Sequence, residues 1–558
     1  MKHDVAVLVV GAGPVGLAMA CELTRHGVPC RILDRNEAPT TQSRALALHA
    51  RTLEVFENVG VIEPVLARGR KIHGLNVSVH GRRIVHLRID LRDLGTPYPY
   101  VLSLSQEETE HILTDLLRQR GVTVERRTEL IDLRQEPDGV VAVLRNPEGP
   151  TREVRARWLI GCDGAGSAVR HRLDLPFEGG EYEEIFLLAD VHLEWNAPDD
   201  EGCVLLQNQG GGFAAFPLPQ PHRWRLIDTT GIDVSDDPGR IVERFRELLI
   251  ANGHREAVIR DAVWCSAFRI HRRVVKHFRV GRCFLAGDAA HIHSPVGGQG
   301  LNTGVQDAYN LAWKLALVEA GAAPDGLLDS YGAERRAVAL DVLRGTDFAT
   351  RIVQLHHPLL GGARNFLAEL LCHLDFVQHQ ISRNLSELGV DYRHSPIVAE
   401  DHAGLIRTLV TNPGSLGDYL DFTHGPHAGD RVPDVILQPA GDAGPSRLFE
   451  VLRGTRHTLL LFHGISPAET SGLSAVLALV RERWAERIRT HVVRRGLTAM
   501  VPSGADGPGL LDPAGHLHRR FGAHAECLYL IRPDGYVGYR SQPPDVTKLR
   551  AYLERIFT

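Results

Sequence analysis

The stretch that decides the fold is Val5-Ala-Val-Leu-Val-Val-Gly11-Ala-Gly13-Pro14-Val15-Gly16-Leu-Ala-Met-Ala-Cys-Glu-Leu23, close to the start of the chain. A run of β-branched and aliphatic residues enters a glycine-rich turn, and a helix-forming segment rich in Ala and Leu follows. A second apolar run, residues 29–33, ends at Asp34 with Arg35 beside it. Strand, glycine turn, helix, strand and acid in this order predict a βαβ unit that binds a nucleotide.

Each glycine of this turn has a distinct predicted role. Gly11 permits the tight turn, Gly13 lets the backbone approach a pyrophosphate at the helix N-terminus, and Gly16 lets the helix lie close to the strand. We expect Pro14, Val15 and Arg35 to border the same nucleotide, and Asp34 to accept hydrogen bonds from its ribose. A secretory signal is the competing interpretation, but Asp4 interrupts its start and Gly13-Pro14 would break its helix.

Composition excludes several function classes. The 558 residues predict two to four domains, and 43% hydrophobic with 23% charged residues is ordinary for globular proteins. A net charge of −5 provides no general field for nucleic acid or an anionic membrane, and no stretch is apolar enough to span a bilayer. The eight cysteines are scattered without CxxC or zinc spacing, so we expect no metal site and reduced thiols in a cytoplasmic protein.

Two further residues near the nucleotide unit are candidates for ligand contact. Arg44 lies near a helix that apolar spacing predicts from about Ala45 to Gly60, where a guanidinium could reach a phosphate or a ring. Gln106 lies in the first turn of another helix, for which Ser105 is the predicted N-cap and Glu108 its capping-box partner. Solvated surface positions are the simpler alternative for both side chains.

Two later strands each end in a Gly/Asp motif. Residues 154–161 form a strand that runs into Cys162-Asp163-Gly164, which puts a carboxylate at the carboxyl edge of a sheet. The strand at residues 282–286 ends in Gly287-Asp288-Ala-Ala-His291, and a glycine-rich loop with Pro295, Gly298 and Gly300 leads into a helix over residues 301–319. So many glycines directly before a helix favour close approach of the backbone to a ligand.

The segments between and after these motifs differ in character. From about residue 185 to 229, strands alternate with Gly/Pro/Gln-rich turns, which predicts a separate antiparallel sheet; Phe213 and Phe216 lie in it. Residues 421–447 are rich in Gly and Pro and indicate a domain boundary. Beyond them lies a compact α/β pattern that ends in a hairpin through the Asp-Gly turn at Gly535.

Taken together, these three motifs resemble the signature set of FAD-dependent aromatic hydroxylases of the p-hydroxybenzoate hydroxylase and phenol hydroxylase type. The tail, with Gly429-Asp430-Arg431 and Arg532-Pro-Asp-Gly535, is similar to the thioredoxin-like domain of phenol hydroxylases and of their polyketide- and antibiotic-modifying relatives. The resemblance implies an α/β fold with a Rossmann-like, glutathione-reductase-type FAD-binding domain over residues 1–180 and 270–390, which includes connecting helices. An antiparallel β-sheet substrate domain is inserted at residues 181–269. A linker at 391–430 and a thioredoxin-like domain at 431–558 complete the chain.

The resemblance also assigns cofactor contacts. It places the FAD pyrophosphate at Gly11, Gly13 and Gly16 and the adenosine ribose at Asp34. The remaining predicted FAD contacts are Pro14, Val15, Arg35, Arg44, Gln106, Asp163, Gly287, Asp288, Pro295, Gly298, Gly300, Leu301 and Asn302. Among these, Asp288 would bind the ribityl chain, and the Leu301 and Asn302 N–H groups would face the pyrimidine end of the isoalloxazine.

The implied activity is a monooxygenase reaction. NADPH or NADH would reduce FAD, O2 would form a flavin C4a-hydroperoxide, and one oxygen would pass to a phenolic or polycyclic, polyketide-like aromatic substrate. Baeyer–Villiger oxidation or epoxidation on the same scaffold, and a reductase or dehydrogenase that inserts no oxygen, stay open as alternatives. Neither the substrate nor the position of oxygenation can be read from the sequence.

Candidate catalytic and substrate residues are fewer. Arg44 and Pro295 would border the reaction space, and Phe213 and Phe216 would line the substrate pocket. No general base is assigned, because structural roles explain His49, His291 and His293 better than a role as base. The tail has His463-Gly-Ile-Ser in place of CxxC and contains Cys527 as its single cysteine, so we expect a packing or dimerisation module, and hence a homodimer, without disulfide chemistry.

Overall fold

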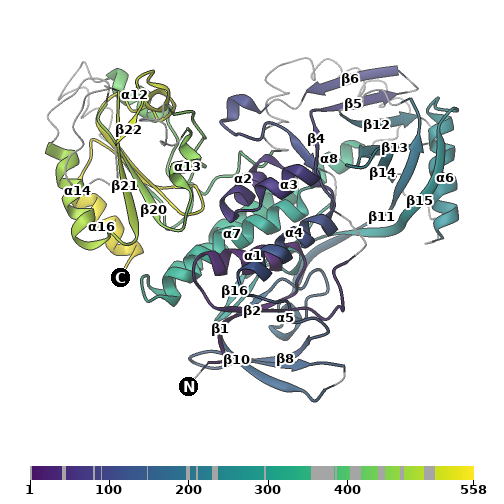
Figure 1. Ribbon diagram of the computed structural model, residues 1–558, viewed down its shortest axis with the longest axis horizontal. Coiled ribbons are helices and arrows are strands. Elements are labelled where there is room, and N and C mark those ends of the chain that lie inside the picture. Colours follow the sequence, from purple (N-terminus) through teal and green to yellow (C-terminus); the bar gives the residue numbers. More distant parts are fainter. Residues whose placement is uncertain are drawn as a thin grey trace. The chain divides into compact units, whose positions relative to one another are not determined.

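The computed structural model describes residues 3–40, 45–79, 82–88, 91–147, 149–196, 202–208, 211–228, 237–294, 297–353, 383, 386–402, 416–437, 446–464, 471–495 and 509–558 (Figure 1). The chain divides into two compact units. The first unit comprises Met1–Asp93, Tyr98–Tyr309 and Arg335–Leu388, and the second comprises Leu94–Pro97, Asn310–Glu334 and Gly389–Thr558. The helices α7 (Gly300–Glu319) and α8 (Asp329–Val353) therefore each contribute residues to both units.

The first unit is built on a sheet that places the glycine turn at its carboxyl edge. Its parallel strands lie in the order β17-β10-β1-β2, and antiparallel strands β16, β9 and β8 extend it. The six residues of β1 are buried or nearly so, as expected for a parallel strand covered on both faces. The strand bounds are β1 (Val5–Val10), β2 (Cys30–Leu33), β8 (Glu129–Gln135), β9 (Val140–Arg145), β10 (Arg152–Gly161), β16 (Arg279–Val280) and β17 (Cys283–Leu285).

Helices pack beside this sheet. The helix α1 (Pro14–Arg25) begins at the glycine turn and lies beside α4 (Gln106–Gln119), where the Cys21 thiol donates to the Leu113 carbonyl at 3.6 Å. The Ser105 side chain caps α4 by accepting from the Glu108 N–H at 3.2 Å, as predicted. The other helices of this part are α2 (Ala50–Val59), α3 (Ile62–Arg68), α5 (Ala168–Arg172), and the 3₁₀ turns η1 (Arg92–Leu94) and η2 (Gly287–Ala289).

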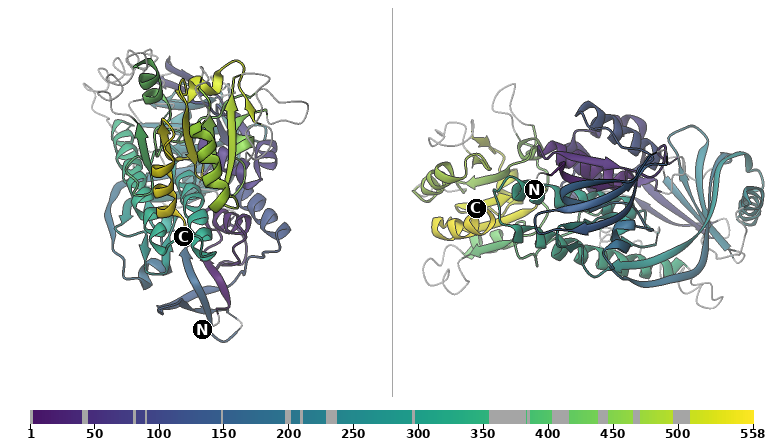
Figure 2. Two further views of the ribbon diagram at one scale, coloured as in Figure 1. Left: turned by 90° about the vertical axis from the view of Figure 1, so that its left-hand side faces the viewer. Right: turned by 90° about the horizontal axis from the view of Figure 1, so that it is seen from below.

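A second sheet follows the order β18-β15-β11-β14-β13-β12-β5-β6. Its apolar face packs against α6 (Pro238–Ala251), whose Ile241, Phe245 and Leu248 are buried, and Figures 1 and 2 show α6 on the outer side of this sheet. The strand bounds are β5 (Gly74–Val79), β6 (Arg82–Arg88), β11 (Phe177–Glu194), β12 (Gly202–Asn208), β13 (Gly211–Pro217), β14 (Arg223–Asp228), β15 (Val258–Val275) and β18 (His291–Ile292). A small third sheet joins β3 (Ala47–Leu48), β7 (Val101–Ser103) and β4 (Arg70–Ile72).

The long strands β11 and β15 connect the second sheet to the motif at Gly287. They pair over most of their length, and the end of β15 also pairs with β18, with Val274 opposite His291. The antiparallel sheet therefore continues directly into the loop that precedes α7.

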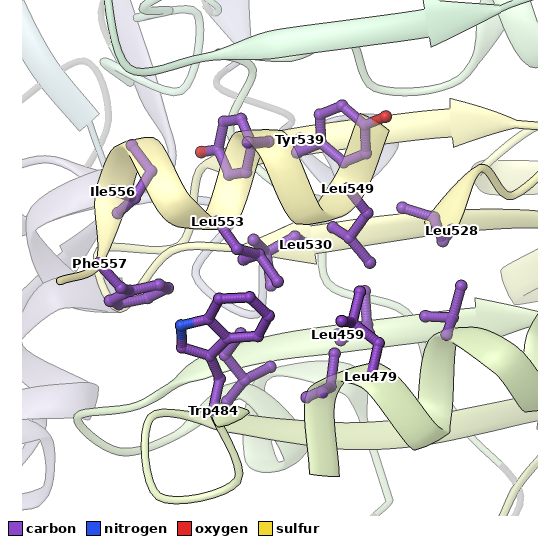
Figure 3. Packing of buried hydrophobic residues seen from close by; sticks show 14 of the residues in the cluster. Leu459, Leu479, Trp484, Leu528, Leu530, Tyr539, Leu549, Leu553, Ile556 and Phe557 are labelled. Atoms are coloured by element: carbon purple, nitrogen blue, oxygen red, sulfur yellow. The ribbon is translucent and has the colours of Figure 1, made fainter. Parts of the chain in front are cut away.

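The second unit is a sheet in the order β19-β24-β23-β20-β21-β22 with helices on its faces. Figure 3 shows the packing of one face, where side chains of α14 and α16 meet those of β20 and β23 around Trp484, Leu530 and Leu553. The bounds are β19 (Ala399–His402), β20 (His457–Phe462), β21 (Ile488–Arg494), β22 (Leu510–Leu511), β23 (Cys527–Ile531), β24 (Val537–Gln542), α12 (Leu416–His424), α13 (Leu448–Leu452), α14 (Ser471–Arg483), α15 (His516–Arg520), α16 (Val546–Ile556) and η3 (Asp325–Leu328).

Two predicted element boundaries are wrong. The segment from Ala45 first forms strand β3, and the helix begins only at Ala50. In the tail, the sequence from Ser474 to Ile488 predicts one helix, but α14 ends at Arg483 and Ile488 is the first residue of β21. The mixed α/β class and the order of its elements agree with the prediction.

Candidate active site

The first glycine of the turn joins two of the predicted motifs. Gly11 has a φ of +100°, which favours glycine, and its N–H donates to the Leu33 carbonyl at 2.8 Å. A Cβ atom at this position would lie 2.4 Å from the carbonyl oxygen of Cys162. The turn after β1 is therefore in backbone contact with the Cys162-Asp163 motif after β10.

The other two glycines of the turn have different surroundings. A Cβ atom on Gly16 would lie 1.9 Å from the Gly11 carbonyl oxygen, whereas a Cβ atom on Gly13 would meet nothing within 4 Å. Gly13 is the N-cap of α1 and provides no side-chain cap, and Pro14 follows it. The first turn of α1 thus leaves backbone N–H groups and open space for an anionic group such as a pyrophosphate.

Asp34 organises the turn at the end of β2. Its Oδ2 accepts from the Ala12 N–H at 2.7 Å and its Oδ1 accepts from the Asn36 N–H at 2.8 Å, while Arg126 lies 4.0 Å from Oδ2. The side chain is largely buried, and the neighbouring Arg35 is exposed. Asp34 therefore fixes the turn, and its contact with a ribose stays a prediction.

Asp163 is held by the short helix that follows it. Its carboxylate accepts from the Ser167 hydroxyl at 2.5 Å and from the Val169 N–H at 3.1 Å. Burial raises the pKa of Asp163, and these hydrogen bonds oppose the shift. From the same helix, Arg170 donates to the Ala165 carbonyl at 2.7 Å and to the Ala289 carbonyl at 3.1 Å, so it links the Asp163 and Asp288 motifs.

Val15 joins the glycine turn to the Gly287 motif. Gly287 has a φ of +58°, and a Cβ atom on it would lie 2.8 Å from Val15 Cγ2; one on Gly304 of α7 would lie 2.5 Å from the same atom. The Asp288 side chain is exposed next to this contact. The three motifs thus meet in one unit, with Asp288 on the accessible side.

The start of α7 is anchored by a buried charge cluster that the sequence analysis missed. Asp307 accepts from the Gly287 N–H at 2.9 Å, from Arg335 Nε at 2.6 Å and from His291 Nε2 at 2.7 Å. Burial would raise the pKa of Asp307, but Arg335 and His291 together hold it below its usual value. The position of Asp307, an acidic residue in the apolar sequence of α7, was the available signal, and it does not identify the partners.

Asn302 fixes the glycine-rich loop through its side chain. Its Oδ1 accepts from the His49 N–H at 2.9 Å, and its Nδ2 donates to the carbonyls of Ala47 at 2.8 Å and Gly298 at 2.7 Å. Gly298 has a φ of +65°, and a Cβ atom on it would lie 3.0 Å from Ala47. The loop is therefore held against β3 by side-chain and backbone contacts.

The histidines around this loop hydrogen-bond to neighbouring groups of the chain. His49 Nε2 donates to the Gly297 carbonyl at 2.8 Å, and His293 Nδ1 donates to the Ser294 carbonyl at 2.9 Å. Burial lowers the pKa of both residues to about 4. His291 is bonded to Asp307, so each of the three imidazoles has one nitrogen engaged, which agrees with structural roles for all three.

The remaining predicted residues are placed as follows. Arg44 and Pro295 lie outside the described residues. Gln106 donates to Glu110 at 2.9 Å, Gly300 lies beside His293, and Leu301 is half-buried at the start of α7. Phe213 is buried in the core against Phe245, with ring centroids 6.0 Å apart, whereas Phe216 packs in a cluster with Ala47.

These residues fit FAD on three observations of the structure. The first turn of α1 is uncapped and open at Gly13, the Asp34 carboxylate is fixed beside that turn, and the Asp288 carboxylate is exposed after β17. Within the described residues, no group of three or more His, Cys, Asp or Glu side chains could hold a metal ion. Nor does the described part of the chain contain a helix long and apolar enough to cross a membrane.

Comparison with known families finds two matches. The FAD binding domain family matches residues 4–346, and the family described as aromatic-ring hydroxylase, C-terminal, matches residues 425–558. The first match covers the three motifs, and the second covers most of the second unit's sheet.

Individual proteins match over nearly the full chain. 6-Methylpretetramide 4-monooxygenase from Streptomyces rimosus is 37% identical over 99% of this chain and 93% of its own length. Pentachlorophenol 4-monooxygenase from Sphingobium chlorophenolicum is 32% identical over 96% of this chain and 94% of its own. The structure of a ternary complex of aklavinone-11 hydroxylase with FAD and aklavinone superposes with a TM-score of 0.75, at 27% identity, over 100% of this chain and 99% of the other.

Proposed function

The chain belongs to the FAD-dependent aromatic-ring hydroxylases, and on that basis we propose that it hydroxylates a polycyclic aromatic substrate of the polyketide type. It is an FAD-dependent monooxygenase, which uses NADPH or NADH as the electron donor and O2 as the oxygen source. The substrate class is the part that we propose. It is supported by relatives named for 6-methylpretetramide and aklavinone, which match almost the whole chain.

The observation that carries the proposal is the convergence of the three motifs in one unit. Gly11 contacts Cys162, Val15 contacts Gly287, and Arg170 bonds to Ala289, so the three motifs lie next to one another. The second sheet continues into the same loop through the pairing of β15 with β18. A substrate bound between this sheet and the loop would lie next to the ring end of the cofactor.

When bound, FAD accepts electrons from the nicotinamide and activates O2 for transfer to the ring. The residues of this chain would bind and orient the cofactor: the α1 N-terminus would hold the pyrophosphate, Asp34 the ribose and Asp288 the ribityl chain. Asn302 and Gly298 hold the loop against β3. A fixed loop next to the reacting atoms supports positioning of the substrate and exclusion of water.

The test is an assay of the purified protein loaded with FAD. A panel of polycyclic phenols, simple phenols and cyclic ketones is incubated with NADPH or NADH under ¹⁸O2, while nicotinamide oxidation and product mass are followed. We expect one ¹⁸O atom in a hydroxylated polycyclic product. Ring expansion or an epoxide would assign Baeyer–Villiger oxidation or epoxidation instead, and nicotinamide oxidation without ¹⁸O incorporation would indicate a reductase.

The assignment of Asp288 can be tested separately. We expect Asp288→Ala to weaken FAD binding about tenfold or more, because a hydrogen bond to a charged group contributes about 1.5–3 kcal/mol. FAD titration of the apoprotein by flavin fluorescence measures the effect. Asp341→Ala is the matched control, since Asp341 is 74% exposed on α8 and pairs only with the nearby Arg344 among the described residues. Equal FAD affinity of Asp288→Ala and the unchanged protein would contradict the assignment.

We also propose the finer parts of the sequence interpretation. The division into an FAD-binding part at 1–180 and 270–390, a substrate sheet at 181–269 and a tail at 431–558 stays a proposal. The sheets cross these bounds, because the second sheet also contains β5, β6 and β18 and the sheet of the second unit also contains β19. The second unit also includes residues 310–334. A cytoplasmic location agrees with the seven described cysteines, all of which are free thiols. A homodimer stays a prediction that sedimentation of the purified protein would test.

A further inference from the structure

Three strand ends meet at one edge of the second unit's sheet. β20 pairs with β21 and β21 with β22, all in parallel, so their carboxyl ends lie at the same edge. His463 directly follows β20, Arg494 is the last residue of β21, and Asp512 directly follows β22. The carboxyl edge of parallel strands is where open α/β sheets bind ligands.

Backbone hydrogen bonds hold these residues together. The His463 N–H donates to the Val493 carbonyl at 3.2 Å, and the Asp512 N–H donates to the Arg494 carbonyl at 2.7 Å. His518 joins them from α15, because its N–H and its Nδ1 both donate to Asp512 Oδ2, at 2.8 and 2.7 Å. We call His463, Arg494, Asp512 and His518 the edge cluster.

The edge cluster is buried but contains unused donors. Its four residues are at most 9% exposed, with Arg494 at 8%. Arg494 Nε, His463 Nε2 and His518 Nε2 are buried atoms without a hydrogen-bond partner. Within the described residues no carboxylate forms an ion pair with Arg494, and Asp512 Oδ2 already accepts two hydrogen bonds from His518.

The charges of the edge cluster are unbalanced. The pKa of His463 is lowered by burial first and then by the neighbouring Arg494 and His518. His463 therefore lies within electrostatic reach of two basic side chains, while Asp512 is bonded to His518. A buried guanidinium without a counterion destabilises a protein, and a bound anion would remove that penalty.

We propose that the edge cluster binds an oxyanion, the phosphate or carboxylate group of a small ligand, with Arg494 as the main contact and His463 and His518 as further donors. The planar guanidinium matches both groups with two parallel hydrogen bonds. Asp512 orients the His518 ring, which also packs edge-on against Phe462 at 5.4 Å between ring centroids. The proposal is independent of the monooxygenase reaction, because no residue of the edge cluster belongs to the first unit.

The test uses the full-length, FAD-loaded protein and two probes, inorganic phosphate and acetate, at constant ionic strength set with potassium chloride. Isothermal titration calorimetry measures binding, and the melting temperature of the protein is recorded with and without each probe. We expect saturable binding of at least one probe and a rise in melting temperature with its concentration. Tighter binding of phosphate would assign a phosphate ligand, and tighter binding of acetate a carboxylate.

Variants of Arg494 show whether this residue binds the probe or only stabilises the fold. We expect Arg494→Gln to weaken the preferred probe at least about tenfold and, without probe, to leave the melting temperature unchanged or higher, since an unpaired buried charge is removed. Arg494→Lys keeps the positive charge but lacks the planar guanidinium that forms two parallel hydrogen bonds, so it should also weaken binding of the probe. Arg481→Gln, an exposed site on α14, is the control and should bind as the unchanged protein does.

Three results would overturn the proposal. The first is no saturable binding of either probe, and the second is equal affinity of Arg494→Gln and the unchanged protein. The third is a marked loss of stability or failure to fold of Arg494→Gln without probe, together with unchanged binding by Arg494→Lys, which would show that Arg494 has a structural role.

Discussion

At the scale of single residues, Glu387 carries the clearest pH dependence. Its carboxyl group is buried, and it accepts from Gln306 Nε2 and from the Thr303 hydroxyl at 3.4 Å. Burial raises the pKa of Glu387 from 4.5 to about 8, although Arg335 and these hydrogen bonds oppose the shift. Between these two pH values the folded protein keeps a proton that the unfolded chain releases. Stability from this site is therefore full below pH 4.5 and is lost as pH rises toward 8.

The variant Glu387→Gln tests whether this site loses stability as pH rises. Gln is neutral at every pH and keeps an acceptor for Gln306, so the variant should lose less stability than the unchanged protein between pH 5 and 8. The difference is on the order of a few kcal/mol. Urea unfolding midpoints of the FAD-loaded proteins at several pH values measure it. Glu129→Gln, at an exposed ion pair, is the control, and parallel pH curves for Glu387→Gln and the unchanged protein would refute the assignment.

At the scale of elements, the N-terminus of α1 separates folding from cofactor binding. Gly13→Ala introduces a Cβ atom into open space at a φ of −74°, so the apoprotein should fold normally. Gly16→Ala introduces one 1.9 Å from the Gly11 carbonyl oxygen, which the turn cannot accommodate. We expect Gly13→Ala to lower FAD affinity at unchanged melting temperature of the apoprotein, and Gly16→Ala to lower both. Equal FAD affinity of Gly13→Ala and the unchanged protein would place the pyrophosphate elsewhere.

The same element shows how far the sequence predicts the structure. The β1–α1–β2 unit was predictable because its constraints act within one short stretch, from Val5 to Asp34. The Asp307 cluster was not, because its partners Gly287, His291 and Arg335 are 16 to 28 residues away and come together only through tertiary packing. Local spacing carries no signal for such contacts.

The two aromatic candidates of the second sheet also show what the sequence cannot predict. Phe213 and Phe216 are three residues apart on β13, so alternation along a strand places them on opposite faces. The sequence contains that information, but it does not say which face meets the loop. In the structure Phe213 packs beside α6, whereas Phe216 shares a cluster with Ala47, the residue against Gly298. Their roles toward a substrate stay predictions, and Phe216 lies on the face nearer the FAD loop.

At the scale of the whole molecule, the tail shares its core with a segment outside it. Residues 310–334 belong to the second unit, and Trp313 and Leu327 are part of the core that Figure 3 shows in close-up. Glu334 accepts from Arg532 at 2.7 and 3.0 Å and from Lys314 at 2.7 Å, all fully buried. Burial lowers the pKa of Lys314 to about 8, although Glu334 opposes the shift. The positive charge of Lys314 in this network therefore depends on the Glu334 carboxylate.

We therefore expect the fragment 389–558 to be unstable when expressed alone. It would retain Arg532 and Asp534 but lose Glu334, Lys314 and the apolar cover of Trp313, and breaking a buried ion pair costs about 3–5 kcal/mol. Adding a synthetic peptide of residues 310–334 should raise the melting temperature of the fragment with peptide concentration, whereas the same peptide with Glu334→Gln and Trp313→Ala should raise it less. Circular dichroism follows both titrations. Cooperative unfolding of the fragment at one temperature, whichever peptide is present, would show that the tail is an autonomous domain and that the buried network adds nothing to its fold.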